Sequence, residues 1–544
     1  MDTVLSDHVI IECLTTFSIL NGNRNGELSE SGKESEVGFD SLNFFSEDTD
    51  WVGLENELKH HNWKLEFRSC SAELMLEKFV EVCKSISIKY VPVRKKKKIS
   101  QNKSLIPRDR KNLLRKRRRI TAQLKKTSSD TRRKKLKSES VNVEKELIKS
   151  YQQSQKDCEN KAVNAIKRNS KYFFSYPKKF STAKIGIGPF IDATENLVTS
   201  SIEMAEMLAE QYSSVYSTPG EPLPKANELF SDDHTGNKWL HNITFDEEDI
   251  VEAIDQISSS AAAGPDRFPA ILLKMCKLSL SKPLFIIWRS SLDCGEIPQR
   301  LKTATVVPIH KGGSCGTPEN YRPVALTSHL IKLFERVMKK YIIAYLEENN
   351  LFNPGQHGFR QGRSCLSQLI AHFDNISRLL EDGKNVDVLY LDFAKAFDKV
   401  DFLATLRKLH QMGISGKVGK WIYSFLTNRT QSVIVNGLTS TCAEVKSGVP
   451  QGSVIGPLLF LVLISDIDQK VATTFLSSFA DDTRVTKGIS TEEDVEALQC
   501  DLQAIYDWAE ENRMVFNNHK FECLRYGKTM NSKNPQAINL HLVI

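Results

Sequence analysis

Three carboxylates are the residues of this chain that most directly predict chemistry. Asp481 and Asp482 are adjacent in a short polar turn, and Asp392 follows the apolar run at 386–391. If these segments are neighbouring strands, the three side chains meet and provide hard oxygen ligands for two Mg²⁺ ions roughly 4 Å apart. Without cations, mutual repulsion would make such a cluster costly. The pattern therefore predicts a two-metal site for phosphoryl transfer, with Mn²⁺ as the alternative metal.

An adjacent pair of aspartates is weak evidence by itself, because surface turns often carry such pairs. Here, however, both acids lie between the apolar run at 475–479 and the strand-like residues 483–485. We therefore expect them at the tip of a β-hairpin beside the strand that ends at Asp392.

The part of the chain from about residue 243 to 527 alternates between helical and strand periodicity. We expect strands at 303–309, 386–391 and 431–435, the last closed by Asn436-Gly437. We expect helices at 245–257, 332–346, 399–412, 418–426 and after Pro457. This mixture predicts an α+β domain.

Positive charge is concentrated upstream of that domain. Residues 91–140 hold 21 Lys or Arg and three acids, a net charge of +18, whereas the whole chain carries +7. Such a block is typical of a surface that binds phosphate backbones. A solvated linker and a nuclear-import signal are the alternative interpretations of the same residues.

Composition narrows the class of protein. The longest apolar stretch, 457–464, is far shorter than the roughly 20 residues that span a bilayer, so no membrane partner is expected. The 11 cysteines include no Cys-x-x-Cys pair, which argues against a zinc finger or a disulfide framework. We expect an intracellular protein, in the nucleus, the cytoplasm or both, and its oligomeric state stays open.

Further motifs surround the three aspartates in a fixed order. They are Ala-Ala-Gly-Pro-Asp at 262–266, Val-Val-Pro-Ile-His-Lys at 306–311 with Asn-Tyr-Arg-Pro-Val at 320–324, Gln-His-Gly-Phe-Arg at 356–360, Leu-Asp-Phe-Ala-Lys-Ala-Phe-Asp at 391–398, Ser-Gly-Val-Pro-Gln-Gly-Ser at 447–453 and Phe-Ala-Asp-Asp at 479–482. Over residues 245–527 the chain resembles the reverse transcriptase of a non-LTR retrotransposon, of the LINE type and Jockey-like kind.

The resemblance implies roles for the acidic motif. Asp392, Asp481 and Asp482 would be the catalytic metal ligands, and the main-chain carbonyl of Phe393 would also face a metal. Lys520 would be the acid that protonates the departing pyrophosphate.

The resemblance also implies a nucleotide site. Lys311 and Arg322 would contact the incoming triphosphate, and Gln451 would lie beside nucleotide and template. The ring of Phe397 would exclude a 2′-hydroxyl and so select deoxynucleotides. The simpler interpretations are a core position for Phe397, a surface position for Lys311 and a capping loop around Gln451.

The implied architecture is a right-hand polymerase with fingers and palm, the palm built on an antiparallel sheet. It would occupy residues 236–544, with its core at about 303–527, after a helical, basic connecting region at 51–235 and a disordered linker at 15–50. Residues 1–14, with Ser6-Asp7-His8, resemble the end of an endonuclease domain and would be its remnant. Because 17 residues follow Gly527, we expect the thumb to be missing.

The function implied is RNA-directed DNA polymerisation, in which deoxynucleoside triphosphates extend a primer 3′ end on an RNA template. The partners would be RNA template, DNA primer or target DNA, and nucleotide. Two alternatives stay open: a catalytically silent fragment that binds nucleic acid, and a maturase or telomerase-like polymerase. The intact aspartates argue against the first, and Ser6-Asp7-His8 with the Gly-Pro-Asp and Gly-Phe-Arg segments argues against the second.

Overall fold

The computed structural model describes residues 38–94, 107–127, 129–165, 187–192, 194–217, 221–230, 239–517 and 520–527. Three segments with predictions lie outside the described residues. They are the endonuclease remnant at 1–14, most of the linker at 15–50, and the end of the chain, where the thumb was expected to be missing.

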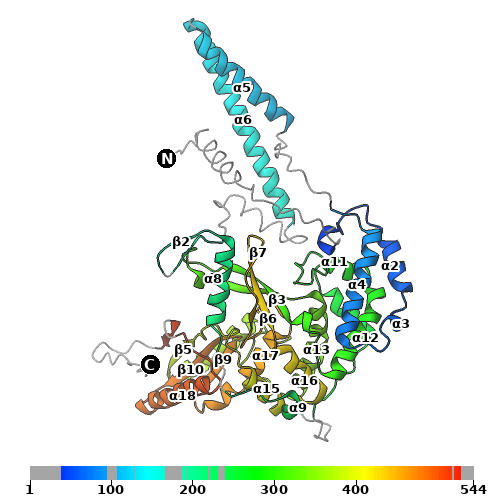
Figure 1. The fold of residues 1–544 in the computed structure, drawn as a ribbon. Helices are drawn as coiled ribbons and strands as arrows, with labels where there is room; N and C mark the ends of the chain where they lie inside the picture. The colour runs from blue at the N-terminus through cyan, green and yellow to red at the C-terminus, as the bar shows by residue number, and fades with distance from the viewer. Residues whose placement is uncertain are drawn as a thin grey trace.

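A four-stranded antiparallel sheet carries the acidic motifs, as predicted. Its order is β11-β5-β10-β9, formed by β5 (Asn385–Leu391), β9 (Phe475–Phe479), β10 (Asp482–Ile489) and β11 (Glu522–Tyr526). In the register, Thr483 of β10 pairs with Leu391 of β5, while Asp482 pairs with Phe479 of β9. The segment that ends at Asp392 is therefore the direct neighbour of the hairpin that bears the two other aspartates (Figure 1).

A second sheet lies beside the first and is mixed rather than antiparallel. It contains β3 (Thr303–His310), β4 (Tyr321–Leu326), β6 (Thr430–Val435), β7 (Leu438–Thr439) and β8 (Ala443–Glu444). Strands β3 and β6 are parallel, and the other pairs are antiparallel. The predicted turn at Asn436-Gly437 is confirmed, since both residues have positive φ, 49° and 88°.

Helices surround both sheets and confirm most of the predicted positions. They are α9 (Ala226–Leu229), α10 (Glu247–Asp255), α11 (Ala270–Met275), α12 (Lys277–Cys294), α13 (His329–Glu348), α14 (Cys365–Glu381), α15 (Phe402–Gln411), α16 (Gly416–Leu426), α17 (Gly456–Leu463) and α18 (Glu492–Glu511). Single helical turns lie at η1 (Phe39–Ser41), η3 (Gln299–Lys302), η4 (Pro318–Asn320) and η5 (Ile467–Lys470). Apolar faces of most of these helices share one core with the four-stranded sheet, which we call the palm sheet, while α14 packs on that sheet through a separate cluster that contains Ile376, Val386 and Val388.

The described end of the predicted linker is packed, which corrects that prediction for residues 39–50. Phe39, Leu42 and Phe44 are buried in the main core, next to α2 (Trp51–His60), α3 (Trp63–Glu66) and α4 (Ala72–Tyr90). The Phe39 ring meets Phe268 at 5.3 Å and the Phe44 ring meets Trp51 at 6.1 Å, so contacts from other segments bury these residues although they show no helical or strand period.

The predicted boundary at 235/236 does not separate two packing units. Helix α8 (Ser201–Ser214) lies upstream of it, after the short strands β1 (Phe190–Ile191) and β2 (Leu197–Val198). Its residues Met204, Leu208 and Tyr212 form one buried cluster with residues of β3, β4 and β6. Helix α8 is therefore a layer on the mixed sheet (Figure 1).

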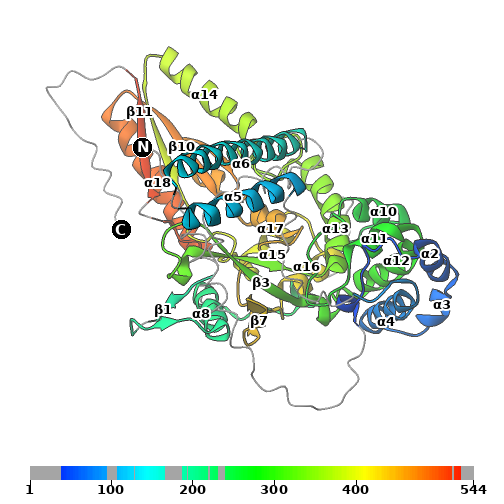
Figure 2. The same ribbon diagram turned by 90° about the horizontal axis from the view of Figure 1, so that it is seen from above.

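The basic region forms a pair of antiparallel helices that we call the arm. Helices α5 (Arg108–Lys126) and α6 (Asp130–Ala165) pack through Ile120, Leu136, Val143 and Leu147. Figure 1 shows the arm standing away from the two sheets, and Figure 2, seen from above, shows α5 and α6 side by side. In the part of the chain that the structure describes, no helix has the length and apolar character needed to cross a membrane.

Candidate active site

The turn that presents Asp481 and Asp482 is tight and held from outside. It joins β9 to β10 through Ala480 and Asp481, and Ala480 has a φ of 58°, which is unfavourable for a residue other than glycine. A backbone in this conformation needs neighbouring contacts that specify it.

Gln356 provides those contacts. Its amide oxygen accepts hydrogen bonds from the N–H of Ala480 at 2.8 Å and of Gly358 at 2.7 Å, and its amide nitrogen donates to the Ala480 carbonyl at 3.1 Å. A Cβ on Gly358 would lie 2.3 Å from the Ala480 nitrogen, so only glycine allows this approach. The motif at 356–360 therefore shapes the acidic turn, a role that its sequence alone did not reveal.

Asp392 has two polar partners. Its Oδ2 accepts a hydrogen bond from Lys520 Nζ at 2.7 Å and a longer one from Asn517 Nδ2 at 3.4 Å. The main chain around it pairs with the segment at 515–517, where Ala394 N–H donates to the Val515 carbonyl and Asn517 N–H to the Asp392 carbonyl. This pairing does not use the carbonyl of Phe393, and the Phe393 ring stacks on Phe516 at 4.5 Å.

The electrostatics of Asp481 reflect the neighbouring acids. Burial raises the pKa of its carboxyl, and the negative charges of Asp482 and Asp392 raise it further, while Lys520 acts in the opposite direction. Within the described residues, no three His, Cys, Asp or Glu side chains are gathered in a geometry that could hold a metal ion. The effect on the Asp481 pKa shows that the three acids are close enough to interact electrostatically. The cation that contacts Asp392 here is the Lys520 ammonium.

A cavity of about 630 Å³ opens between the palm strands, the mixed sheet and α8. Of the nine predicted site residues, eight line it, and they are Lys311, Arg322, Asp392, Phe393, Phe397, Gln451, Asp481 and Lys520. Asp482, at the exposed start of β10, is not part of the lining. Residues from motifs more than 200 positions apart are therefore brought to one hollow.

Phe397 is half-buried at the cavity wall. Its ring stacks on Phe460 with centroids 4.9 Å apart, and Phe359 meets it edge-on at 6.1 Å. The ring is thus fixed in orientation but still lines the cavity. Phe397 is therefore not solely a core residue, which was the simpler interpretation of its position.

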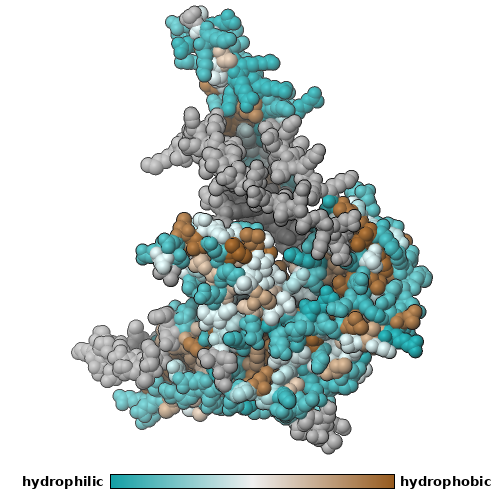
Figure 3. Space-filling model, viewed as in Figure 1, coloured by the Kyte–Doolittle hydropathy of each residue, from teal (hydrophilic) through white to brown (hydrophobic). Residues whose placement is uncertain are grey.

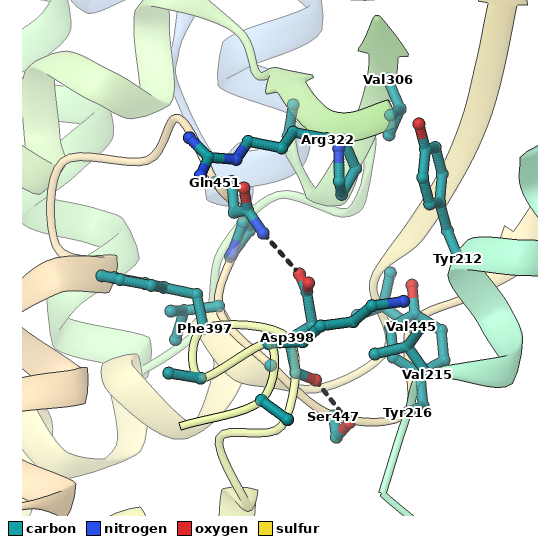
Figure 4. Close-up of a pocket in the computed structure, with 18 of the residues that line it drawn as sticks. Tyr212, Val215, Tyr216, Val306, Arg322, Phe397, Asp398, Val445, Ser447 and Gln451 are labelled. Carbon is teal, nitrogen blue, oxygen red and sulfur yellow. Dashed lines mark hydrogen bonds between the residues drawn. The ribbon is translucent and has the colours of Figure 1, made fainter. Parts of the chain in front are cut away.

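Gln451 is oriented by Asp398. Its amide nitrogen donates to Asp398 Oδ1 at 2.8 Å, as Figure 4 shows, and this directs the amide oxygen away from the carboxylate. Burial raises the pKa of Asp398, and the bond from Gln451 acts in the opposite direction.

The loop at 447–453 also fits tightly against the rest of the site. A Cβ on Gly448 would lie 2.6 Å from the Asp398 carbonyl oxygen, and one on Gly452 would lie 2.3 Å from that of Ala325. Glycine at these two positions therefore allows the loop to approach its own neighbouring backbone.

Lys311 and Arg322 extend from the mixed sheet with exposed side chains. Lys311 follows β3 and Arg322 lies on β4, and the N–H of Lys311 donates to the Asn320 carbonyl at 2.9 Å. Two fixed positive charges therefore border the cavity opposite the aspartates, where an anionic group would be attracted.

Helix α8 and the residues just beyond its end contribute side chains that sequence reasoning missed. Tyr212 and Tyr216 line the cavity on the other side of Asp398 from Phe397 (Figure 4). The Tyr216 hydroxyl accepts a hydrogen bond from Gln431 at 2.7 Å, and burial followed by the charge of Asp398 raises the pKa of both tyrosines. The local sequence of a helix does not identify the sheet against which it packs, and so these two tyrosines were not found.

Comparisons with known proteins agree with the motifs. Residues 309–535 match the family described as reverse transcriptase (RNA-dependent DNA polymerase). The chain is 31% identical over 221 residues, 40% of its length, to the probable RNA-directed DNA polymerase from transposon BS of Drosophila melanogaster, covering 24% of that protein. It is 28% identical over 305 residues, 54% of its length, to the RNA-directed DNA polymerase from mobile element jockey of Drosophila melanogaster, covering 33% of it.

Among solved structures, apo telomerase from Candida tropicalis, truncated from its C-terminal domain, aligns with a TM-score of 0.33 and 11% identity. The alignment covers 43% of this chain and 51% of that one. This chain spans between a quarter and a third of the length of the two curated relatives. The matched region is a reverse transcriptase domain, of the kind found in non-LTR retrotransposons.

Proposed function

We propose that this chain acts as an RNA-directed DNA polymerase that extends a primer 3′ end with deoxynucleotides on an RNA template. The observation that supports the proposal is the shared cavity, whose lining includes two of the three acids, Asp392 and Asp481, together with the predicted nucleotide-site residues Lys311, Arg322, Phe397 and Gln451. The names of the relatives, which are RNA-directed DNA polymerases of mobile elements, support the same reaction.

Reverse transcriptases in general use divalent metal ions, and the donor set here suits them. Carboxylates are the ligands that Mg²⁺ prefers, and a cation, Lys520, already lies on Asp392. The three acids are not gathered into a metal-holding group within the described residues, and we infer that Asp392, Asp481, Asp482 and the Phe393 carbonyl would come together to hold two Mg²⁺ ions, or Mn²⁺ in their place. Such ions would stabilise the charge on the attacking and leaving oxygens.

The other residues of the cavity bind and orient the substrate in this proposal. Lys311 and Arg322 neutralise the triphosphate, and Gln451 presents its amide oxygen to the nucleotide because Asp398 holds its amide nitrogen. The Phe397 ring occupies the space that a 2′-hydroxyl would need. Lys520, whose ammonium now lies on Asp392, would be the residue that gives a proton to the pyrophosphate if a metal ion took its place on that carboxylate.

Primer extension tests the reaction. The full chain, an RNA template with an annealed DNA primer, deoxynucleotides and Mg²⁺ should give extended primer. Asp481→Asn should lower the rate by on the order of a thousandfold, because several kcal/mol of charge stabilisation is lost. Glu493→Gln, an exposed carboxylate on α18, is the matched control and should leave the rate unchanged.

Binding of the same primer and template, measured with both variants, separates catalysis from folding. If the parent chain binds but does not extend the primer, the polymerase proposal is wrong and a silent nucleic-acid-binding protein is the better description. Template choice then addresses the telomerase-like alternative, since such an enzyme would copy a dedicated RNA rather than a supplied one.

A further inference from the structure

The arm carries its positive charge at the end where its two helices are joined. Between residues 115 and 137, twelve residues are Lys or Arg and one, Asp130, is acidic. The remainder of α6, residues 138–165, holds four lysines against five acids. The arm therefore has a strongly basic end, which we call the basic tip (residues 115–137), and a nearly neutral base.

Folding concentrates this charge. The clusters at 115–119 and 132–135 lie on different helices, and the antiparallel pairing of α5 with α6 brings them to the same end of the arm. Ile120 and Leu136 are buried between the helices. The cations therefore point outward, and Lys125, Lys134 and Lys135 are among those that are exposed.

The tip cannot neutralise itself. Lys116 Nζ lies 3.5 Å from Glu139 Oε1 at the edge of the tip, but Asp130 is the sole acid within it. So many like charges on neighbouring faces repel one another, and a bound polyanion relieves this repulsion and releases counterions.

The surface chemistry of the tip selects the kind of polyanion. Within the described residues, no large exposed hydrophobic side chain lies between positions 108 and 137, and Figure 3 shows the end of the arm as mostly hydrophilic. Insertion into a bilayer and stable association with another protein both need apolar or aromatic anchors. A phosphodiester backbone needs only spaced cations.

We propose that the basic tip is a binding site for the phosphate backbone of nucleic acid, separate from the cavity. Helix α6 has 36 residues, a length of about 54 Å, and the arm stands away from both sheets (Figure 1). The tip therefore holds RNA or DNA at a distance from the reacting end and raises affinity without contacting the reacting groups. This site goes beyond polymerisation and exists whether or not the chain is catalytically active.

Binding measurements with matched charge variants test the proposal. The tip variant combines four substitutions at exposed lysines: Lys125→Gln, Lys126→Gln, Lys134→Gln and Lys135→Gln. The base variant removes the same charge from the other end of the arm: Lys145→Gln, Lys149→Gln, Lys156→Gln and Lys161→Gln. Lys and Gln have similar helix propensities, so circular dichroism should show unchanged helix content in both.

The probes are a labelled single-stranded RNA, a DNA duplex of matched length and vesicles containing phosphatidylserine, each titrated at several salt concentrations. We expect the tip variant to bind nucleic acid at least about tenfold more weakly than the parent chain. The slope of log affinity against log salt should fall by about 3, since each lost phosphate contact removes 0.7–0.9. The base variant should bind like the parent.

If the tip variant loses affinity for RNA alone, or for DNA alone, this result supports the site and identifies its ligand. If the tip variant and the base variant lose the same affinity for nucleic acid, only the total charge matters and the proposal is overturned. Unchanged nucleic-acid binding by the tip variant, or a loss confined to the vesicles, also overturns it. Repeating the RNA titration with Asp481→Asn keeps this result independent of catalysis.

Discussion

At the scale of single residues, the cavity depends on polar side chains that are each oriented by another motif. Asp398 lies one residue after Phe397 and binds the amide of Gln451 from the loop at 447–453. Ser447 donates to the Asp398 carbonyl at 2.9 Å and accepts from the N–H of Ser217 at 2.9 Å, the latter just beyond α8. Asp398 thus connects the cavity wall at Phe397 with the loop at 447–453, through its carboxylate and its main-chain carbonyl.

The selectivity for deoxynucleotides should depend on Phe397. In Phe397→Ala, the space beside the sugar opens, and the discrimination against ribonucleotides in primer extension should fall by about 100-fold. Phe359→Ala removes the edge-on ring but not the wall, so it should retain the discrimination. Unchanged sugar selectivity in Phe397→Ala would contradict the steric role.

Glu335 predicts a pH dependence of stability. It is fully buried on α13, and its Oε2 accepts hydrogen bonds from the N–H of Val454 at 2.5 Å and of Ile455 at 3.0 Å. Burial nevertheless raises the pKa of its carboxyl above the ordinary value of 4.5. The folded state therefore holds this proton more tightly than the unfolded state, and the stabilisation is lost as pH rises from 4.5 through the raised pKa.

Denaturant unfolding at a series of pH values tests this prediction. Relative to Glu335→Gln, the parent chain should lose free energy of unfolding as pH rises through that window. Glu348→Gln, an exposed carboxylate on the same helix, should follow the parent. Parallel curves for the parent and Glu335→Gln would show that the buried carboxyl does not titrate in this way.

At the scale of elements, the segment at 355–358 acts as an addition to the palm sheet. His357 N–H donates to the Ser478 carbonyl at 2.9 Å, and Ser478 N–H donates to the Gly355 carbonyl at 2.9 Å. The edge strand β9 is thereby covered, and the turn after it is fixed by Gln356. The orientation of Asp481 therefore depends on a loop more than 120 residues earlier in the chain.

Gln356→Ala should disturb this turn. It leaves the buried N–H and carbonyl of Ala480 without their partner, at a cost of about 2–3 kcal/mol in the free energy of unfolding. Primer extension should fall by more than this loss of stability explains, because the acidic turn is no longer held. Gln469→Ala, at an exposed position, is the control, and equal effects of the two substitutions would exclude the clamp.

At the scale of the whole molecule, segments from outside the matched domain complete the fold. Helix α8 covers the mixed sheet and supplies Tyr212 to the cavity, and Tyr216 follows just beyond its end. Residues 39–90 share the main core with the helices that support the palm. The unit that folds together is therefore larger than residues 309–535.

Leu208 tests this larger unit. Its side chain is fully buried between α8 and the mixed sheet, so Leu208→Ala should reduce the free energy of unfolding by about 2–4 kcal/mol. The variant should unfold in one thermal transition with a lower midpoint, and its primer extension should fall as well. Glu210→Ala, exposed on the same helix, should change neither, and a local loss of α8 without an effect on activity would separate it from the catalytic unit.

The sequence by itself indicated the family of this protein's matched region and most of its secondary structure. The order of the motifs indicated the reverse transcriptase family, and apolar periodicity located strands such as β3 and β5 and helices such as α13, because these signals are local. The adjacent pair Asp481-Asp482 and its partner Asp392 also followed from local pattern alone.

Only the tertiary structure decided which distant residues meet. Three contacts of the site join residues that are more than 100 positions apart in the sequence. Gln356 holds Ala480, Lys520 lies on Asp392, and α8 closes the cavity. No local periodicity predicts such pairings. The packed residues 39–50 and the charge at the end of the arm have the same origin. Burial and charge density are properties of the folded surface, so they appear only when the chain is brought together.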